Sequence, residues 1–399
     1  MTEVAEAEAL ILERMGRFQA RETPLDECVG AVLRETVHAE RDQPPFDRVT
    51  MDGIAIDHGA WQAGRRRYRV AGTQGAGAPA LSIASPAQCV EIMTGAMLPV
   101  GTDTIIPVER LTIEAGEAAV QPSAVVSPGQ FIHPQGSDRS AGSRVLSRGR
   151  RIGPAEVAIL AGVGRARVRT TEPPRIAVVS TGDELVEAGE PLEPYQIRSS
   201  NDRAIEAALV RRFGAQVTRA SLKDDPAEIL ESIARLHERH DVVILTGGVS
   251  MGKYDFVPGV LERLGVELVF HRIEQRPGRP MWFGVSQSSR PVFALPGNPV
   301  STLVCLIRYV VPALWKAMGA DPEAQEWVRL ARQVEFSPDL AYFLPVTLRT
   351  GPGSIPQAEP RPTNTSGDYV ALGGTDGFIE LPRGTDAYPA DMPARLFRW

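Results

Sequence analysis

The sequence predicts a multidomain protein in which an α/β domain is combined with β-rich domains. From Arg175 to about Gly319, apolar strand-like runs alternate with amphipathic helical stretches, a pattern typical of a mostly parallel sheet covered by helices. From Phe46 to about Arg150 the chain instead carries short β-type runs separated by glycine, proline and serine, and residues from about 320 to 399 again read as short strands with proline and glycine turns. With 399 residues the chain is long enough to form several hydrophobic cores, so we expect separate domains.

The α/β segment contains clear strand and helix signals. Two apolar runs, IAVVSTG and DVVILTGG, predict buried strands. A helix is expected to begin at about Asn201 and to end at Gly214, a residue type that commonly terminates helices. The apolar face of this helix is formed by residues four apart, which are Ile205, Leu209 and Phe213.

Two further segments are interpreted as helices. Residues 1–40 hold two apolar stretches at helical spacing. The most apolar run of the chain, from Val300 to Trp315, contains Arg308 and Pro312 and is too short to cross a bilayer. We therefore expect a buried helix there.

Charge and cysteine content exclude several classes of protein. A formal net charge of -6 argues against nucleic acid or an anionic membrane as the main partner. The three cysteines are isolated and lack CxxC spacing, so neither a disulfide framework nor a zinc site is predicted. The acidic start of the chain lacks the basic flank and apolar core of a secretory signal. We expect a cytoplasmic protein with no nucleic-acid partner and no membrane partner.

Carboxylates gather where the strands of the predicted α/β sheet end, which is where such sheets bind ligands. Glu184, Asp224 and Asp255 have no obvious helix to cap, whereas Asp225 fits an N-cap and Asp183 can serve as another. Like charges gathered at one edge need a cation to neutralise them, and hard oxygen ligands suit Mg²⁺ bridging a pyrophosphate. Asp224 and Asp255 are the predicted metal ligands.

Two turns at the same edge can bind anions. In TGGVSMG, the glycines around Ser250, among them Gly248, let the backbone approach a ligand and direct N–H groups at phosphate. Taken alone, such a turn is more often a tight strand-to-helix connection. In RPGRP, Arg276 and Arg279 form a natural oxyanion clamp because a guanidinium carries paired donors. From spacing alone, a solvated basic turn fits about as well.

An ordered set of motifs spans nearly the whole chain. In chain order these motifs are TMDGIAI, IMTGAMLP, GSDRSAG, STGDEL, KDDP, TGGVSMGKYDF, RPGRP and ALPGNPVS. Together they resemble the molybdopterin molybdenumtransferases, a family that includes the bacterial MoeA enzymes and the E domain of gephyrin. Each motif alone is weak evidence for the family, and the order of all the motifs along the chain is the specific evidence.

The resemblance implies both the architecture and the reaction. The implied domains are an elongated discontinuous domain (1–43 and 141–172), an inserted β domain (44–140), an α/β molybdopterin-binding domain (173–320) and a C-terminal β-barrel (321–399). The implied reaction is the insertion of molybdate into adenylyl-molybdopterin with release of AMP, with Mg²⁺ as the cofactor. A homodimer is implied as well, and we expect the upstream molybdopterin adenylyltransferase as a partner.

The resemblance also adds site residues. The implied active cleft joins the α/β domain of one subunit to the inserted β domain of the other. Asp52 and Asp138 would then face the carboxylates Glu184, Asp224 and Asp255, and these five are the candidate catalytic residues. The residues implied as contacts of the cleft or of molybdate are Thr94, Ser250, Pro296, Asn298, Ser301 and Ser366.

The chain departs from the family pattern in three places. Both lysines of the family's KPGKP turn are arginines, Arg276 and Arg279, in a chain that holds three lysines in all. Where many relatives carry an arginine near a short strand, this chain reads YFLPV from Tyr342. Ala371 stands where a second serine is common. A direct molybdate contact is therefore missing at the second place or is supplied from elsewhere.

Two other functions share parts of this pattern. The adenylyltransferase of the preceding step shares the α/β unit, but the inserted β domain with Asp52 and Asp138 argues against that activity. A non-catalytic scaffold has gephyrin as its precedent, by analogy only. The intact acidic motifs favour an enzyme over a scaffold.

Overall fold

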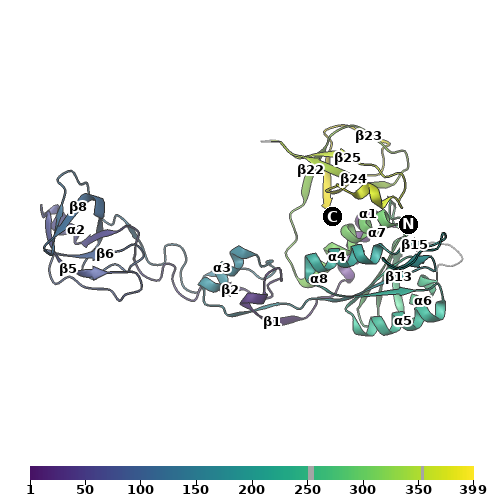
Figure 1. Cartoon of the computed structure of the whole chain (residues 1–399), viewed down its shortest axis with the longest axis horizontal. Helices are drawn as coiled ribbons and strands as arrows, with labels where there is room; N and C mark the ends of the chain where they lie inside the picture. The colour runs from purple at the N-terminus through teal and green to yellow at the C-terminus, as the bar shows by residue number, and fades with distance from the viewer. Residues whose placement is uncertain (250–255, 352–354) are drawn as a thin grey trace. The chain divides into compact units, whose positions relative to one another are not determined.

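The computed structural model describes residues 1–249, 256–351 and 355–399 (Figure 1). Contacts divide the chain into two compact units. Unit 1 contains Met1–Glu35, Arg148–Val157 and Arg167–Trp399, and unit 2 contains Thr36–Ser147 and Ala158–Ala166. The finer boundaries of the four predicted domains stay a prediction.

A mixed sheet organises the α/β part of unit 1. Its strands are β13 (Arg175–Thr181), β16 (Gln216–Leu222), β17 (Val242–Thr246), β18 (Val266–His271), β20 (Trp282–Ser286) and β21 (Pro291–Leu295). They lie in the order β16-β13-β17-β21-β20-β18, and β20 runs antiparallel to its neighbours β21 and β18. Both faces of the central strands are covered, which explains why β13, β17 and β21 are apolar almost throughout.

Helices cover both faces of this sheet (Figure 1). One face packs against α1 (Val4–Arg14), α4 (Asn201–Phe213), α7 (Pro299–Cys305) and α8 (Val311–Met318). The other face packs against α5 (Pro226–Arg239) and α6 (Val257–Arg263). The predicted α/β fold class is confirmed.

The end of α4 and the start of α5 were predicted correctly from nearby residues. Gly214 follows α4 with a φ of 58°, a left-handed conformation that glycine adopts without a steric cost. Asp225 caps α5, because its carboxylate accepts hydrogen bonds of 2.9 Å from the backbone N–H groups of Ala227 and Glu228.

The apolar segment from Pro299 to Met318 is a core helix. A π-helical turn, η3 (Leu306–Val310), joins α7 to α8. The expected short length is wrong, because among the described residues this 20-residue segment is the helix whose length and composition could span a membrane. Its predicted burial is confirmed, since 83% of its most apolar window is buried inside the fold. Arg308 is 1% exposed and its guanidinium binds the carboxylates of Glu8 at 2.9 Å and Glu380 at 3.1 Å. A buried charge is thus compensated by two carboxylates.

The helical interpretation of residues 1–40 is wrong beyond α1. The short helix η1 (Leu25–Glu27) is preceded by β1 (Ala20–Pro24), which pairs antiparallel with β12 (Arg167–Thr171). Further along, β2 (Val37–His38) pairs with β11 (Arg144–Leu146). Pro24 and Gly30, which has a φ of 82°, interrupt any helix here. The strand partners lie more than a hundred residues away in sequence, so local periodicity could not reveal them.

Unit 2 is built on a mixed sheet that shares a hydrophobic core with the short helix α2 (His58–Gln62). Its strands are β4 (Gly53–Ile56), β5 (Arg67–Gln74), β6 (Gln88–Ile92), β7 (Thr104–Pro107), β8 (Leu111–Glu114) and β9 (Glu117–Val120). They lie in the order β7-β4-β6-β5-β9-β8. A two-strand ladder pairs β3 (Arg48–Val49) with β10 (Ile132–His133). Further along the chain, α3 (Pro154–Gly162) begins at the predicted proline.

The C-terminal part of unit 1 is a closed barrel. Its strands are β22 (Glu326–Leu330), β24 (Ala341–Arg349), β25 (Gln357–Pro360), β26 (Gly377–Leu381) and β28 (Pro393–Arg398). They follow the order β24-β25-β22-β28-β26, and β26 pairs back with β24 to close the barrel. Two short strands outside this ring, β23 (Val334–Glu335) and β27 (Ala387–Tyr388), pair with each other.

A short strand from the α/β part joins this barrel. The strand β19 (Gln275–Arg276) pairs parallel with β24, which places Arg276 opposite Tyr342. The predicted C-terminal barrel is confirmed, and it is tied directly to the RPGRP turn.

The ion pair at Arg308 leads to a stability prediction. Glu380→Ala is expected to lower the free energy of unfolding by about 3 kcal/mol, because the buried guanidinium would lose one of its two carboxylates. Urea unfolding followed by circular dichroism measures this change. The control is Glu326→Ala, which breaks a pair with Arg398 in which both side chains are 50% exposed. The control substitution should lower the free energy of unfolding by less than about 1 kcal/mol. Equal decreases in both variants would contradict the stabilising role of the buried ion pair.

Candidate active site

A cavity of about 790 Å³ lies at the carboxyl ends of β13, β17 and β21. We call it the strand-end cavity. Among the residues that line it are Thr181, Glu184, Asp224, Gly248 and Asn298. The cavity therefore occupies the edge at which open α/β sheets bind ligands.

Two of the predicted catalytic carboxylates meet in the strand-end cavity. Glu184 is exposed and folds back over Gly182, where an added Cβ would approach its Oε2 to 2.7 Å. Asp224 is half-buried and its backbone N–H donates to Oδ1 of Asp183 at 3.3 Å. The capping role considered for Asp183 is wrong, because this carboxylate accepts from a loop amide instead. The predicted residues Asp255 and Ser250 lie outside the described residues.

Glu184 and Asp224 fit a magnesium ion that arrives with a phosphorylated ligand. Among the described residues, no three His, Cys, Asp or Glu side chains are grouped to hold a metal by themselves. Mg²⁺ commonly uses one or two carboxylates and completes its shell with substrate phosphates and water. The two carboxylates on the cavity wall match that donor set.

The glycine turn after β17 packs tightly against the end of β13. Gly247 and Gly248 have φ values of 93° and 64°. A Cβ on Gly247 would lie 2.6 Å from the carbonyl oxygen of Thr181, and one on Gly248 would lie 3.0 Å from its Oγ1. Close packing thus accounts for these glycines, in agreement with the interpretation of this turn as a tight strand-to-helix connection. Gly248 also lines the strand-end cavity, which keeps it a candidate ligand contact.

Asn298 connects the α/β part to the barrel part. It precedes α7 at the cap position but makes no capping hydrogen bond with its side chain. Instead, its Nδ2 donates to Oγ of Ser366 at 2.7 Å, while the backbone N–H of Val300 donates to the Ser366 carbonyl at 3.1 Å. Because the Ser366 hydroxyl accepts from Asn298, its own hydrogen is free to donate to a ligand.

Asn201 is a site residue that sequence reasoning missed. Its Nδ2 donates to the carbonyl of Gly297 at 2.7 Å and to Oγ1 of Thr246 at 2.9 Å. These bonds hold the turn of Pro296 and Gly297 against the end of β17. An asparagine at the first position of a helix gave a weak signal, since it is equally common as a simple cap.

A second cavity of about 690 Å³ lies between the RPGRP turn and the barrel. We call it the arginine cavity. It shares Pro296 and Asn298 with the strand-end cavity. The predicted substrate contacts that line it are Arg276, Arg279, Pro296, Asn298, Ser301 and Ser366. Most of the predicted substrate residues are therefore brought together on two adjoining surfaces of unit 1.

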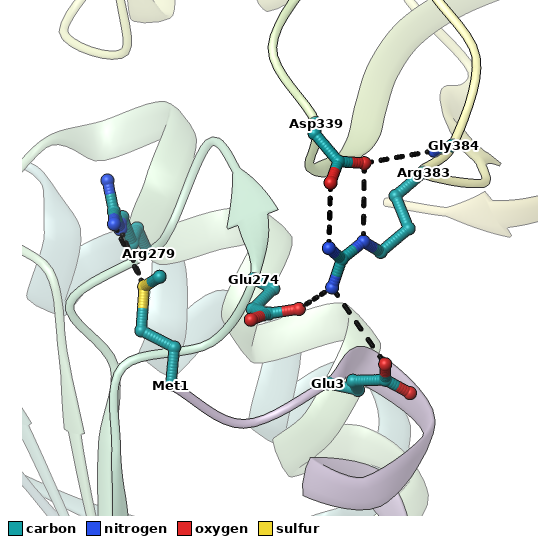
Figure 2. Close-up of polar contacts among 7 residues, drawn as sticks. All are labelled: Met1, Glu3, Glu274, Arg279, Asp339, Arg383 and Gly384. Carbon is teal, nitrogen blue, oxygen red and sulfur yellow. Dashed lines mark hydrogen bonds and ion pairs between the residues drawn. The ribbon is translucent and has the colours of Figure 1, made fainter.

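Both arginines of the turn keep hydrogen-bonding capacity. Arg276 is exposed, and its guanidinium makes no hydrogen bond or ion pair with another described residue. Nε and Nη2 of Arg279 approach the thioether sulfur of Met1 at 3.2 and 2.9 Å (Figure 2). A thioether is a weak acceptor, so this contact leaves the Arg279 guanidinium largely uncompensated. Two such cations on one cavity wall favour an anionic ligand.

The turn that carries these arginines is firmly anchored. Gly278 has a φ of 93°, and an added Cβ would lie 2.6 Å from Sγ of Cys305. Gln275 is fully buried, and its amide donates to the Pro277 carbonyl at 3.0 Å. The hydroxyl of Tyr309 donates to the same side chain. Cys305 and Tyr309 belong to the buried helical segment, so the turn is fixed to the core.

A network around Arg383 holds the strand that leads into this turn (Figure 2). Its guanidinium binds Asp339 at 2.8 Å, contacts Glu3 at 3.8 Å and binds Glu274. Asp339 and Arg383 come from the barrel part, whereas Glu274 immediately precedes β19. The network therefore fastens the barrel to the residues before Arg276. Long-range ion pairs of this kind leave no local sequence signal.

In unit 2, Thr94 fixes the carboxylate of Asp52. Oδ1 of Asp52 accepts hydrogen bonds of 2.6 Å from both the hydroxyl and the backbone N–H of Thr94. These bonds from Thr94 hold the pKa of the Asp52 carboxyl below its ordinary value. The structure thus brings together two residues that were predicted separately, with Thr94 as the residue that orients Asp52.

Asp138 is oriented by His133, a residue that sequence reasoning did not select. Arg48 donates to Nδ1 of His133 at 3.2 Å, and Nε2 of His133 lies 3.0 Å from Oδ1 of Asp138. Arginine can only donate, so Nδ1 is the acceptor and Nε2 carries the hydrogen that is donated to Asp138. The side chain of Asp138 remains 57% exposed and open to a further partner.

Comparison with known proteins identifies the family. Residues 2–164 match the model of the MoeA N-terminal region (domain I and II), and residues 177–316 match that of a probable molybdopterin binding domain. The chain is 36% identical to the molybdopterin molybdenumtransferase of Synechocystis sp., with 100% of each chain covered. The chain belongs to the molybdopterin molybdenumtransferase family. It is therefore a transferase of molybdenum cofactor biosynthesis, as its motifs indicated.

Further relatives extend this family assignment. A molybdopterin molybdenumtransferase of Staphylococcus epidermidis is 32% identical, over 92% of this chain and 88% of its own. A solved structure of the molybdopterin biosynthesis MoeA protein from Pyrococcus horikoshii matches with a TM-score of 0.85 and 29% identity. That match covers 100% of this chain and 99% of the other.

The contact between Thr94 and Asp52 leads to a titration prediction. Thr94→Val removes the hydroxyl donor and keeps the backbone donor, so the pKa of Asp52 should rise toward its ordinary value. A carboxylate with a depressed pKa stabilises the fold above its unfolded pKa and loses that contribution as pH falls through the folded pKa. As the pH falls, the variant should therefore lose the stabilising contribution of the Asp52 carboxylate at a higher pH than the wild type does.

The measurement is a carbon-13 NMR titration of aspartate carboxyls, with Asp52→Asn used to assign the signal. The matched control is Thr73→Val, which removes a hydroxyl that donates to Glu91 at 2.6 Å. That control should leave the Asp52 titration unchanged. An unshifted Asp52 signal in Thr94→Val would show that the hydroxyl does not set this pKa.

Proposed function

We propose that the chain inserts molybdate into adenylyl-molybdopterin and releases AMP, with Mg²⁺ as the cofactor. The observation that carries this proposal is the pair of adjoining cavities on unit 1. One presents carboxylates and a glycine turn, and the other presents two guanidiniums. A phosphorylated substrate fits the first cavity and a small oxyanion fits the second.

The proposal assigns separate tasks to the two cavities. In the strand-end cavity, Glu184 and Asp224 would hold Mg²⁺, which when bound neutralises charge on the phosphoanhydride. Backbone groups near Gly248 would orient the phosphates. In the arginine cavity, Arg276 and Arg279 would bind the molybdate dianion. The two dithiolene thiols lose their protons and bond to molybdenum, and one molybdate oxygen leaves with those protons as water. A water oxygen attacks the phosphoanhydride, whose P–O bond breaks as AMP leaves.

Positioning is the main contribution of the protein in this proposal. Asn298 lines both cavities and holds Ser366, so both substrates would meet fixed groups on one shared wall. Holding two reactants in a fixed geometry removes much of the entropic cost of their encounter. The guanidiniums also offset the repulsion between a molybdate dianion and the phosphates and carboxylates beside it.

We further propose a homodimer in which Asp52 and Asp138 of one copy complete the cleft of the other. Both carboxylates are exposed, and both are oriented by neighbouring side chains. We also propose that the enzyme works in the cytoplasm and receives its substrate from the upstream molybdopterin adenylyltransferase. The chemistry supports that partner, because an adenylylated substrate must come from an adenylyl-transfer reaction.

An AMP-release assay tests the proposed reaction. With adenylyl-molybdopterin and Mg²⁺, the chain should release AMP when molybdate or tungstate is added, and chelation of Mg²⁺ should stop the release. Glu184→Gln should lower the rate by about 100-fold, the scale of losing one electrostatic contributor to an active site. The control is Glu190→Gln, an exposed carboxylate that does not line either cavity.

Other outcomes of this assay point to the alternative functions. AMP release at the same rate with and without molybdate or tungstate would contradict the proposed metal insertion. Formation of adenylyl-molybdopterin from ATP would identify an adenylyltransferase. No turnover under any condition would favour a scaffold.

Subunit mixing tests the proposed homodimer. Asp52→Ala and Glu184→Ala are each expected to be inactive, but their mixture should recover about one quarter of wild-type activity. Random exchange makes about half of the dimers hybrid, and each hybrid has one intact cleft of two. A mixture of Asp52→Ala with Asp138→Ala should recover nothing, because every cleft then lacks one carboxylate. No recovery in the first mixture, after exchange is verified by mass spectrometry, would refute the shared cleft.

A further inference from the structure

Tyr342 lines the arginine cavity and carries an aromatic hydroxyl. It stands opposite Arg276 in the register of β19 and β24, and both residues line the cavity. The ring of Tyr342 stacks on Phe336 with a centroid separation of 4.1 Å and an interplanar angle of 7°. Within the described part of the chain, its hydroxyl makes no hydrogen bond. The ring is thus held in place while its polar end remains available.

The Tyr342 hydroxyl is suited to donate a hydrogen bond. Burial raises the pKa of this phenol, and the opposing effect of the nearby Arg276 charge is smaller. The group therefore stays protonated in the neutral pH range. A guanidinium has donors and no acceptor, so Arg276 cannot accept the phenol's hydrogen. An anion held by Arg276 would supply the missing acceptor.

The rest of the cavity wall is also rich in hydroxyl groups. Ser366 accepts from Asn298, which leaves its hydrogen directed elsewhere. Ser301 is 3% exposed and lines the same cavity. Among the described residues that line the cavity, Glu335 is the carboxylate, against the two guanidiniums. Such a wall provides two cations and several neutral donors, which suits a small oxyanion with acceptors on all sides.

We propose that the hydroxyl of Tyr342 donates a hydrogen bond to the molybdate ion bound by Arg276, and that Tyr342 is a further binding residue of this oxyanion site. The inference rests on the proposed function, because it takes molybdate as the ligand of the arginine cavity. In this inference the oxyanion contacts the guanidiniums of Arg276 and Arg279 and, as a third donor, the neutral hydroxyl of Tyr342 on β24. The stack on Phe336 fixes the direction of that donor.

Isothermal titration calorimetry of the full chain with sodium molybdate tests this role. Tyr342→Phe keeps the ring and its stack on Phe336 but removes the donor. It should raise the molybdate dissociation constant about tenfold, the scale of one lost hydrogen bond to a charged group. The matched control is Tyr388→Phe, another barrel tyrosine, whose hydroxyl donates to the Pro382 carbonyl at 2.7 Å. That control should bind molybdate as the wild type does.

Two arginine variants separate this inference from the proposed function. If Arg276→Ala and Arg279→Ala weaken molybdate binding while Tyr342→Phe binds normally, the tyrosine role is overturned and the cavity's function stands. If the wild type does not bind molybdate, or neither arginine variant changes binding, the oxyanion assignment itself fails. If Tyr342→Phe weakens binding and Arg276→Ala does not, the proposed pairing of these two residues is wrong. Thermal unfolding midpoints equal to that of the wild type establish that each variant is folded.

Discussion

The pairing of β19 with β24 is the contact on which the arginine cavity depends. It carries Arg276 out of the α/β part and makes it a neighbour of Tyr342 in the barrel sheet. The turn that follows is fixed on its other side, because Gly278 packs against Cys305 and Gln275 is bonded by Tyr309. Without this double attachment, the two guanidiniums would sit on a solvated loop. Surface arginines on mobile loops bind anions only weakly, because ordering them costs side-chain entropy.

Charge separation is the second physical feature of unit 1. The strand-end cavity is lined by the carboxylates of Glu184 and Asp224 and by one guanidinium, that of Arg198. The adjoining cavity is lined by the two guanidiniums of the RPGRP turn and by one carboxylate, that of Glu335, and Asn298 lies at the shared wall. An acidic site suits a metal-bound phosphate, and a basic site suits an oxyanion. Bringing two anionic substrates together is costly unless each has its own counter-charge nearby. In the proposed reaction, the arginine cavity would supply the counter-charge for one substrate directly, and the strand-end cavity would supply it for the other through bound Mg²⁺.

Networks far apart in the sequence hold this arrangement. Arg383 joins Glu274 to Asp339, and Asn201 joins Thr246 to Gly297 (Figure 2 shows the first of these). The departure at YFLPV has a structural counterpart as well. Tyr342, the first residue of this stretch, lines the arginine cavity and contributes a neutral polar side chain to its wall.

The sequence alone determined the elements whose signals are local. Asp225 was recognisable as a cap, and Gly214 as a helix end, because capping and left-handed geometry depend on a few adjacent residues. The α/β sheet followed from apolar periodicity, and its carboxyl-end carboxylates followed from chain order. The tertiary structure alone decided the pairing of β1 with β12, the network of Arg383, and the contact of His133 with Asp138. In each case the sequence offers several possible partners, some of them far away along the chain. Only the packing of the folded chain selects the partner that is actually contacted.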